Sequence, residues 1–222
     1  MASLVSNAQS LEDIIAMNLK ARGGSDKILG LKTMVMECIS NRQGMEFPVT
    51  LSFAHNHGFR LDMQIMGKDC FMLINTKAAY NYFPIRGQTH PETMPEEVHK
   101  EMMSRLDLQG DFIGYKEKGV KFKLLPDDKV EENLCYVLMS TGADGKEKTI
   151  YIDKITNLVI KEITKSEVEG EETEIASTYA DFKSVDGYMV PMSISSPMNG
   201  DMKVTKYVIN PELKSEMFVV KN

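Results

Sequence analysis

The sequence has no tryptophan, only three cysteines and no long apolar run. An odd number of cysteines cannot complete a disulfide framework. Cys38, Cys70 and Cys135 each lie in a strand-like run, where a free cysteine packs as a small apolar side chain. No stretch approaches the roughly 20 apolar residues that a membrane-spanning helix needs. These absences exclude a disulfide-stapled scaffold and leave no candidate for a membrane-spanning helix.

The sequence also has no excess of positive charge. It contains 26 Lys and Arg against 32 Asp and Glu, which gives a net charge of −6. Affinity for nucleic acid comes largely from Lys and Arg neutralising phosphates. The lysines here alternate with glutamates and form no basic patch. We therefore expect no nucleic-acid partner.

Sequence motifs of enzymes are missing as well. There is no GxSxG, HExxH, CxxC, P-loop or GxGxxG pattern. The nearest approach to a metal motif is His55-Asn56-His57, which lies in a predicted hairpin turn without a third ligand. We interpret these residues as an exposed turn, and the acidic run from Glu169 to Glu174 as a solvated hairpin. The expectation is a protein that is not an enzyme and needs neither cofactor nor metal.

The chain begins with helical patterns. Leu11, Ile14, Ile15 and Leu19 recur at helical spacing, and Ser10 is a good N-cap. Arg22-Gly23-Gly24 ends that helix, and a second short turn follows through residues 27–29. A further helical segment is expected from Met94 to Gly110, with an apolar stripe of Val98, Met102, Met103 and Leu106.

Most of the remaining sequence has a period of two, which is typical of strands. Residues 47–53 and 59–65 alternate apolar and polar side chains around the turn Asn56-His57-Gly58, so they predict a hairpin. Turn signals recur later at Asp144-Gly145, Thr156-Asn157, Glu169-Gly170, Asp186-Gly187 and Asn199-Gly200. Further strands are expected from residue 32 onward and over residues 70–74, 79–83, 120–125, 134–141, 148–153, 158–165, 174–182, 189–195 and 202–209.

The predicted fold class is mainly β (α+β), with about eleven or twelve antiparallel strands. A sheet of that size curls, and each strand leaves one apolar face to be covered. Two helices are too few to cover it, so we expect a curved antiparallel half-barrel with an incompletely filled concave face. The alternative is a closed barrel or sandwich filled by its own side chains. The 17 methionines suit either an irregular core or an adaptable apolar binding surface.

The first residues, 3–10, resemble the tail of a secretory signal peptide, although an unstructured end fits these residues equally well. We therefore expect a secreted protein with a cleaved signal peptide, of which residues 1–10 are a residual signal or linker segment. Residues 11–222 are expected to form a single domain. No cysteine follows that segment, which favours a soluble carrier over a lipid-anchored receptor.

Several segments, in this order, resemble one protein family. They are Arg22–Ile28, Gly58–Met63, Asp111–Gly119, Tyr151–Asp153, Leu158–Lys161, Tyr179–Pro191 and Ile209–Leu213 before Phe218. Together they are similar to the LolA/LolB-like lipoprotein-carrier superfamily, in the form called outer-membrane lipoprotein-sorting protein in Bacteroidota-type bacteria. The resemblance covers nearly all of residues 11–222. The segment from Lys77 to Pro84 departs from it, because it lacks the Gly-Trp often found there.

The resemblance implies an eleven-or-so-stranded half-barrel with helices over its concave face. It also implies a periplasmic carrier that shields lipoprotein acyl chains or another lipid without a covalent bond. Its partners would be lipoprotein-sorting proteins of the inner and outer membranes, and the chain would be a monomer. The alternative is a ligand-free envelope protein-interaction or stress-sensing module on the same fold.

The strand patterns and the helical stripe supply candidates for the lipid-binding wall. Alternation decides which side chains share a face but not which face is concave. The candidates on the strands are Met34, Met36, Phe47, Val49, Leu51, Phe53, Phe59, Leu61, Met63, Ile65 and Met72, and those on a covering helix are Met102 and Met103.

Overall fold

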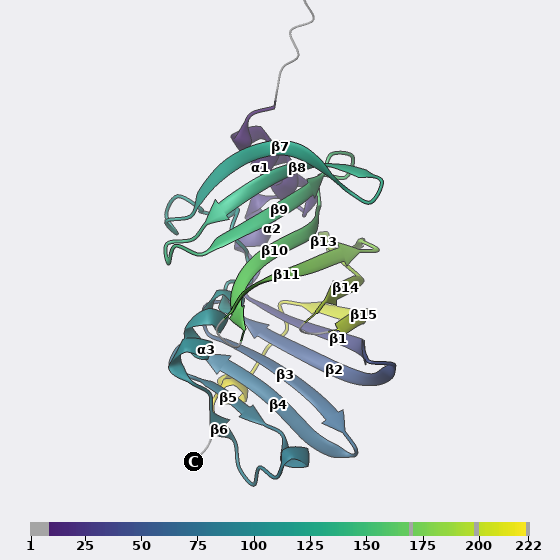
Figure 1. The fold of residues 1–222 in the computed structure, drawn as a ribbon. Helices are drawn as coiled ribbons and strands as arrows, with labels where there is room; N and C mark the ends of the chain where they lie inside the picture. Colours follow the sequence, from purple (N-terminus) through teal and green to yellow (C-terminus); the bar gives the residue numbers. More distant parts are fainter. Residues whose placement is uncertain (1–8, 169–170, 198–199, 221–222) are drawn as a thin grey trace, which may run out of the picture.

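A computed structural model describes residues 9–168, 171–197 and 200–220 (Figure 1). Within these ranges there are three α-helices, three 3₁₀ helices and fifteen strands. The helices are α1 Leu11–Ala21, α2 Ser25–Leu29, η1 Pro84–Arg86, α3 Glu96–Met102, η2 Met103–Leu106 and η3 Ser215–Phe218. The strands are β1 Thr33–Arg42, β2 Met45–Ala54, β3 Gly58–Ile65, β4 Lys68–Asn75, β5 Ala79–Tyr82, β6 Glu92–Thr93, β7 Lys121–Val130, β8 Asn133–Thr141, β9 Glu147–Asp153, β10 Val159–Val168, β11 Glu171–Ala180, β12 Lys183–Val185, β13 Tyr188–Val190, β14 Ser193–Ser196 and β15 Gly200–Ile209.

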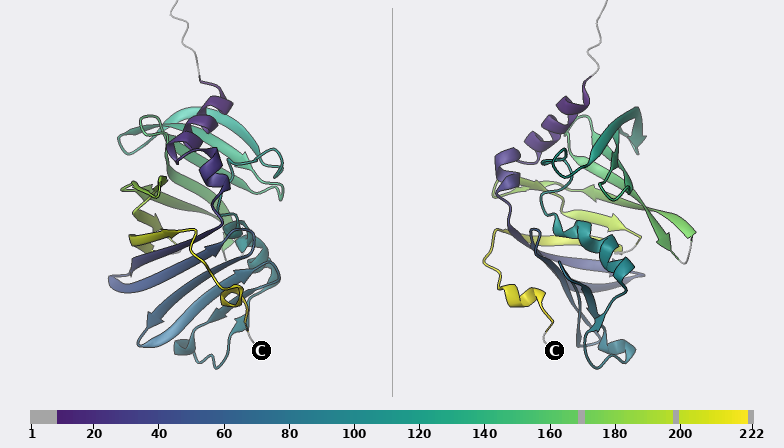
Figure 2. Two further views of the ribbon diagram at one scale, coloured as in Figure 1. Left: turned by 180° about the vertical axis from the view of Figure 1, so that it is seen from behind. Right: turned by 90° about the vertical axis from the view of Figure 1, so that its left-hand side faces the viewer.

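Thirteen of the described strands form one antiparallel sheet, in the order β6-β5-β4-β3-β2-β1-β15-β14-β11-β10-β9-β8-β7. The last strand, β15, pairs with the first, β1, in the middle of the sheet. The sheet curves into an open half-barrel, with α1 and α3 lying inside the curve (Figures 1 and 2). The expected fold class is confirmed.

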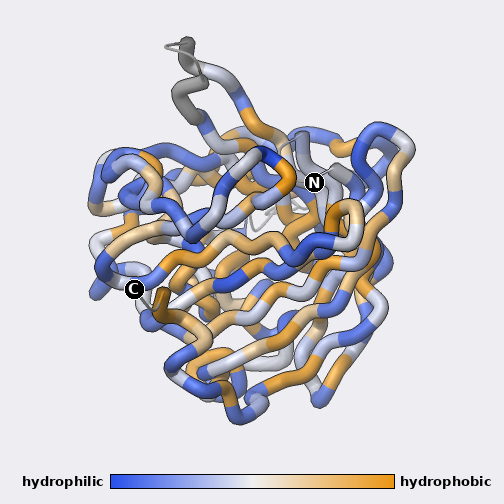
Figure 3. The backbone as a smooth tube through the Cα atoms, turned by 90° about the horizontal axis from the view of Figure 1, so that it is seen from below, coloured by the Kyte–Doolittle hydropathy of each residue, from blue (hydrophilic) through white to orange (hydrophobic). Residues whose placement is uncertain are grey.

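Register joins the apolar positions of neighbouring strands into one face. Met36 pairs with Leu51, Leu51 with Leu61, and Leu61 with Met72, from β1 to β4. Because side chains alternate along a strand, these pairs bring every second residue to the same side. Apolar and polar positions alternate along the tube of Figure 3 in the same way.

Helix α1 covers one end of this face. Ser10 caps it through a capping box with Asp13, which satisfies backbone N–H groups at the helix start. Ile14 and Ile15 are buried against Leu138, Ile150 and Ile152 of β8 and β9. The helix therefore makes a small core with the β7–β10 half of the sheet.

Helix α3 and η2 cover the other end. Met102 and Leu106 are buried in a second core with side chains of β1–β5 and β15, including Met36, Leu51 and Phe59. Figure 2 shows α1 and α3 at separate places along the curved sheet. The middle of the face lies between the two cores.

The C-terminal segment packs on the opposite face of β3 and β4. Phe218 is 1% exposed, and its ring lies where Gly58 has no side chain, so a Cβ there would come within 2.5 Å of ring carbons. Asn75 donates a hydrogen bond to the carbonyl of Phe218, and Arg60 donates one to that of Met217. The C-terminal segment therefore covers this opposite face of β3 and β4.

Most predicted elements are confirmed, with two corrections. The helix expected to reach Gly110 ends at Met102 and continues as the 3₁₀ turn η2, after which the carbonyl of Leu106 accepts a hydrogen bond from Asn56 N–H. The strand expected over 189–195 is split, because β13 pairs with β12 in a separate ribbon and the chain crosses back at Pro191, which has no N–H to donate.

Shorter features explain the remaining differences. The sequence predicts eleven or twelve strands, whereas the described residues form fifteen; β6, β12 and β13 have two or three residues each and are too short for a pattern.

The expected turns at Asp144-Gly145, Thr156-Asn157 and Asp186-Gly187 are present. Glu169-Gly170 and Asn199 lie outside the described residues, as do residues 1–8 of the expected signal segment. All three cysteines are buried and free.

Truncating the buried C-terminal anchor tests its packing. We expect Phe218→Ala to lower the free energy of unfolding by about 3 kcal/mol, because it removes a fully buried ring. Val219→Ala is the matched control, since Val219 is 54% exposed. Urea denaturation of both variants measures the difference; equal small losses would contradict the docked position of the segment.

Candidate functional site

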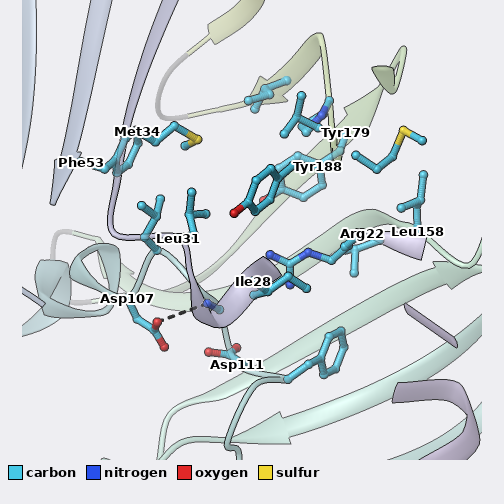
Figure 4. A pocket seen from close by; sticks show the side chains of 18 of the residues that line it. Arg22, Ile28, Leu31, Met34, Phe53, Asp107, Asp111, Leu158, Tyr179 and Tyr188 are labelled. Atoms are coloured by element: carbon cyan, nitrogen blue, oxygen red, sulfur yellow. Dashed lines mark hydrogen bonds between the residues drawn. The ribbon is translucent and has the colours of Figure 1, made fainter. Parts of the chain in front are cut away.

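A cavity of about 470 Å³ occupies the middle of the concave face, between the α1 core and the α3 core. Its sheet side is built by β1, β2, β9–β11, β14 and β15, and its other walls by α2, the turn after α1 and residues 104–112 and 188–191. Figure 4 shows these side chains converging from segments far apart in sequence. The volume is that of a small-molecule pocket.

Much of the cavity wall is apolar. Met34, Met36 and Phe53 come from β1 and β2, and Ile194 and Ile209 come from β14 and β15. Register places Met34 opposite both Phe53 and Ile209, so these side chains form one continuous strip. Further apolar lining comes from Ile28, Leu31, Leu158, Met189 and Val190.

The predicted wall residues on the strands share the concave face, but only some of them line the cavity. Met34, Met36 and Phe53 line the cavity. Ile65 is half-buried at the end of β3, and Met103 is 36% exposed beside α3. The others belong to the core under α3 or pack against it: Phe47, Val49, Leu51, Phe59, Leu61, Met63, Met72 and Met102.

One side of the cavity is charged. The Lys148 ammonium lies 2.8 Å from Asp111 and 3.7 Å from Glu162. Glu162 also accepts a hydrogen bond of 2.8 Å from the Tyr179 hydroxyl. Burial acts to lower the pKa of Lys148, but the charges of Glu162 and Asp111 and the hydrogen bond that Lys148 donates to Asp111 outweigh it, so the pKa of Lys148 is raised. Burial, with help from Glu162, raises the pKa of Tyr179.

Asp107 lies at the same side and is also paired. Its carboxylate forms an ion pair with Lys118 and lies 3.6 Å from Nδ1 of His55. His55 was expected to be exposed in its turn, but its side chain is only 20% exposed because it faces this loop. Within the described ranges no group of three His, Cys, Asp or Glu side chains could hold a metal ion.

Two arginines complete the charged side. Arg22, directly after α1, donates a hydrogen bond from Nη2 to the Gln109 carbonyl at 3.4 Å. Its side chain lies among the lining residues, near Tyr188 and Asp111 in the close view (Figure 4). Arg105, in η2, lies over the ring of Phe59 at 5.7 Å from its centroid.

These charged residues are not among the predicted site residues, although part of the signal is present in the sequence. Lys148 shares strand parity with Ile150 and Ile152, so alternation alone puts it on the apolar face. Glu162 reaches that face because register pairs it with Ile150. For Arg22 and Arg105 we find no local signal, because the end of α1 and the 3₁₀ turn η2 decide where they point.

An open curved antiparallel sheet with helices and an apolar cavity on its concave side is an architecture found in solved structures. A LolA superfamily protein from Nitrosomonas europaea aligns with a TM-score of 0.57 and 15% identity, over 96% of this chain and 98% of that one. A domain named as an outer membrane lipoprotein-sorting protein, from Vibrio parahaemolyticus, gives 0.56 and 14%, over 92% and 94%.

A third structure, a DUF1329 family protein from Desulfovibrio piger, gives a TM-score of 0.54 and 11% identity, over 94% of this chain and 97% of that one. No protein-family model matches the sequence, and no curated protein does. The likeness is therefore one of fold: the expected LolA-like architecture is confirmed. None of the helices in the described ranges is both long and apolar enough to cross a membrane.

Removing the central cation tests the charged side. We expect Lys148→Met to lower the free energy of unfolding by about 2 kcal/mol, because Asp111 and Glu162 lose their hydrogen-bonded counter-charge. The control is Lys100→Met, whose ion pair with Glu96 lies on the exposed surface of α3, and it should leave stability unchanged. Chemical denaturation of both variants measures the effect, and equal midpoints would contradict it.

Proposed function

We propose that this protein is a periplasmic carrier that holds lipoprotein acyl chains, or another lipid, non-covalently in the central cavity. The observation that carries the proposal is the cavity itself: about 470 Å³ on the apolar face, left between two cores that the helices do fill. The family resemblance and the shared fold of a lipoprotein-sorting domain support it.

The energetics of transfer suit this role. Each methylene moved from water into an apolar site is worth about 0.8 kcal/mol, so an acyl chain gains affinity from length alone. Met34, Met36 and Met189 in the lining have flexible, polarisable side chains that adapt to chains of different shape. The binding needs no catalytic group, in line with the expectation that the protein is not an enzyme.

The proposal also covers the partner proteins and the oligomeric state. A carrier of this kind takes its cargo from one membrane complex and gives it to another, so its partners would be lipoprotein-sorting proteins of the inner and outer membranes. In this role it would work as a monomer.

Native mass spectrometry of the purified protein, with organic extraction and an added acylated peptide, tests the proposal. We expect bound fatty acid or phospholipid, or uptake of the peptide. Met34→Glu should reduce the bound fraction about tenfold, because it puts a carboxylate in the apolar strip. Met45→Glu is the matched control, since Met45 is 66% exposed on the neighbouring strand.

Thermal unfolding of both variants separates a lost site from a lost fold, and Met34→Trp fills the cavity without adding charge. A protein free of lipid that also fails to take up the acylated peptide would contradict the carrier role. That result would favour the ligand-free interaction module, whose interior is already filled.

A further inference from the structure

Three carboxylates and three cations line the cavity, but not all of them form ion pairs. The three carboxylates that line it have cationic or hydroxyl partners: Asp107 pairs with Lys118, Asp111 with Lys148, and Glu162 with Lys148 and Tyr179. Each carboxylate of the lining therefore already has a lysine partner, Lys118 for Asp107 and a shared Lys148 for Asp111 and Glu162. The remaining charged residues of the lining are Arg22 and Arg105.

Neither arginine forms an ion pair in the part of the chain that the structure describes. Arg22 donates one hydrogen bond to the Gln109 carbonyl, and Arg105 lies over the apolar ring of Phe59. A guanidinium group has five N–H donors in a planar fork that matches a carboxylate or phosphate. Most of these donors remain for a ligand.

Both guanidinium groups are also partly removed from water. Burial lowers the pKa of Arg22, although Glu162, Asp107 and Asp111 act against it, and burial lowers the pKa of Arg105, against which the Tyr179 hydroxyl acts. A cation held in this way costs free energy until an anion joins it. Such a site is more receptive to an anion than an exposed arginine is.

We infer that the cavity binds amphiphiles with an anionic headgroup, the carboxylate or phosphate meeting Arg22 and Arg105 while the hydrocarbon chain covers Met34, Phe53 and Ile209. The inference rests on the proposed function and adds the class of ligand to it. The apolar strip and both arginines line one cavity, so the cavity offers contacts to both ends of such a molecule. The hydroxyls of Tyr188 and Tyr207 are already bonded to backbone carbonyls.

Displacement of a neutral fluorescent probe, N-phenyl-1-naphthylamine, by matched ligands tests this. At about pH 8, dodecanoate is ionised and 1-dodecanol has the same chain without charge. We expect dodecanoate to bind at least about tenfold more tightly than dodecanol. In Arg105→Gln and Arg22→Gln that preference should fall toward unity, because the headgroup loses its guanidinium partner.

Arg42→Gln is the matched control, because Arg42 lies exposed at the end of β1, away from the cavity lining. Thermal unfolding of each variant checks the fold, and Arg105→Lys, which keeps the charge, should retain part of the preference. Inorganic phosphate alone should displace the probe only at far higher concentration, since it has no chain to bury.

The outcomes separate the two proposals. Equal affinity of dodecanoate and dodecanol, unchanged by the arginine substitutions, would overturn the headgroup site and leave the apolar carrier intact. Tight displacement by phosphate alone would make the site an anion site without need of a chain, which also overturns the inference. If neither dodecanoate nor dodecanol binds, the carrier proposal fails together with it.

Discussion

The fold depends on covering a single, very long apolar face. Thirteen antiparallel strands carry that face from β6 to β7, and cross-strand register keeps it continuous through the central pair β1 and β15. Because apolar area left in water costs about 25 cal/mol per Å², the sheet curls and the helices of the chain pack against its apolar face. Helices α1 and α3 cover the two ends. Neither of these helices covers the middle of the apolar face, and the cavity forms there between α2, residues 188–191 and the sheet.

Charge at the edge of an apolar cavity is the second constraint. Lys148 lies between Asp111 and Glu162, so these partly buried carboxylates have a counter-charge without help from a ligand. Arg22 and Arg105 are not balanced in this way within the described residues. The paired charges stabilise the fold, and the arginines without an ion pair line the cavity. This difference gives a physical reason for the cavity to prefer anionic ligands over neutral ones, beyond apolar transfer alone.

Alternation and turn residues in the sequence predict most of the fold. The period of two over residues 47–53 and 59–65 correctly predicts the β2–β3 hairpin and the shared face of Leu51 and Leu61. The candidate site is predicted less fully, because helix placement decides which part of the face stays open. Leu61 and Met63 lie in the core beneath α3, whereas Met34 and Phe53 line the cavity, and alternation treats the four alike. Arg22 and Glu162 enter the site through a turn after α1 and through strand register, which no local pattern contains.

The most direct test of the central claim is nuclear magnetic resonance of isotope-labelled methionine methyl groups during titration with an acyl-chain ligand. The 17 methionines sample the cavity, the α3 core and the surface in one spectrum. If the cavity holds the chain, the methyl signals of Met34, Met36 and Met189 shift together, while those of exposed Met45 and Met66 do not move. Shifts confined to Met45 and Met66, or no shift at saturating ligand, would contradict it.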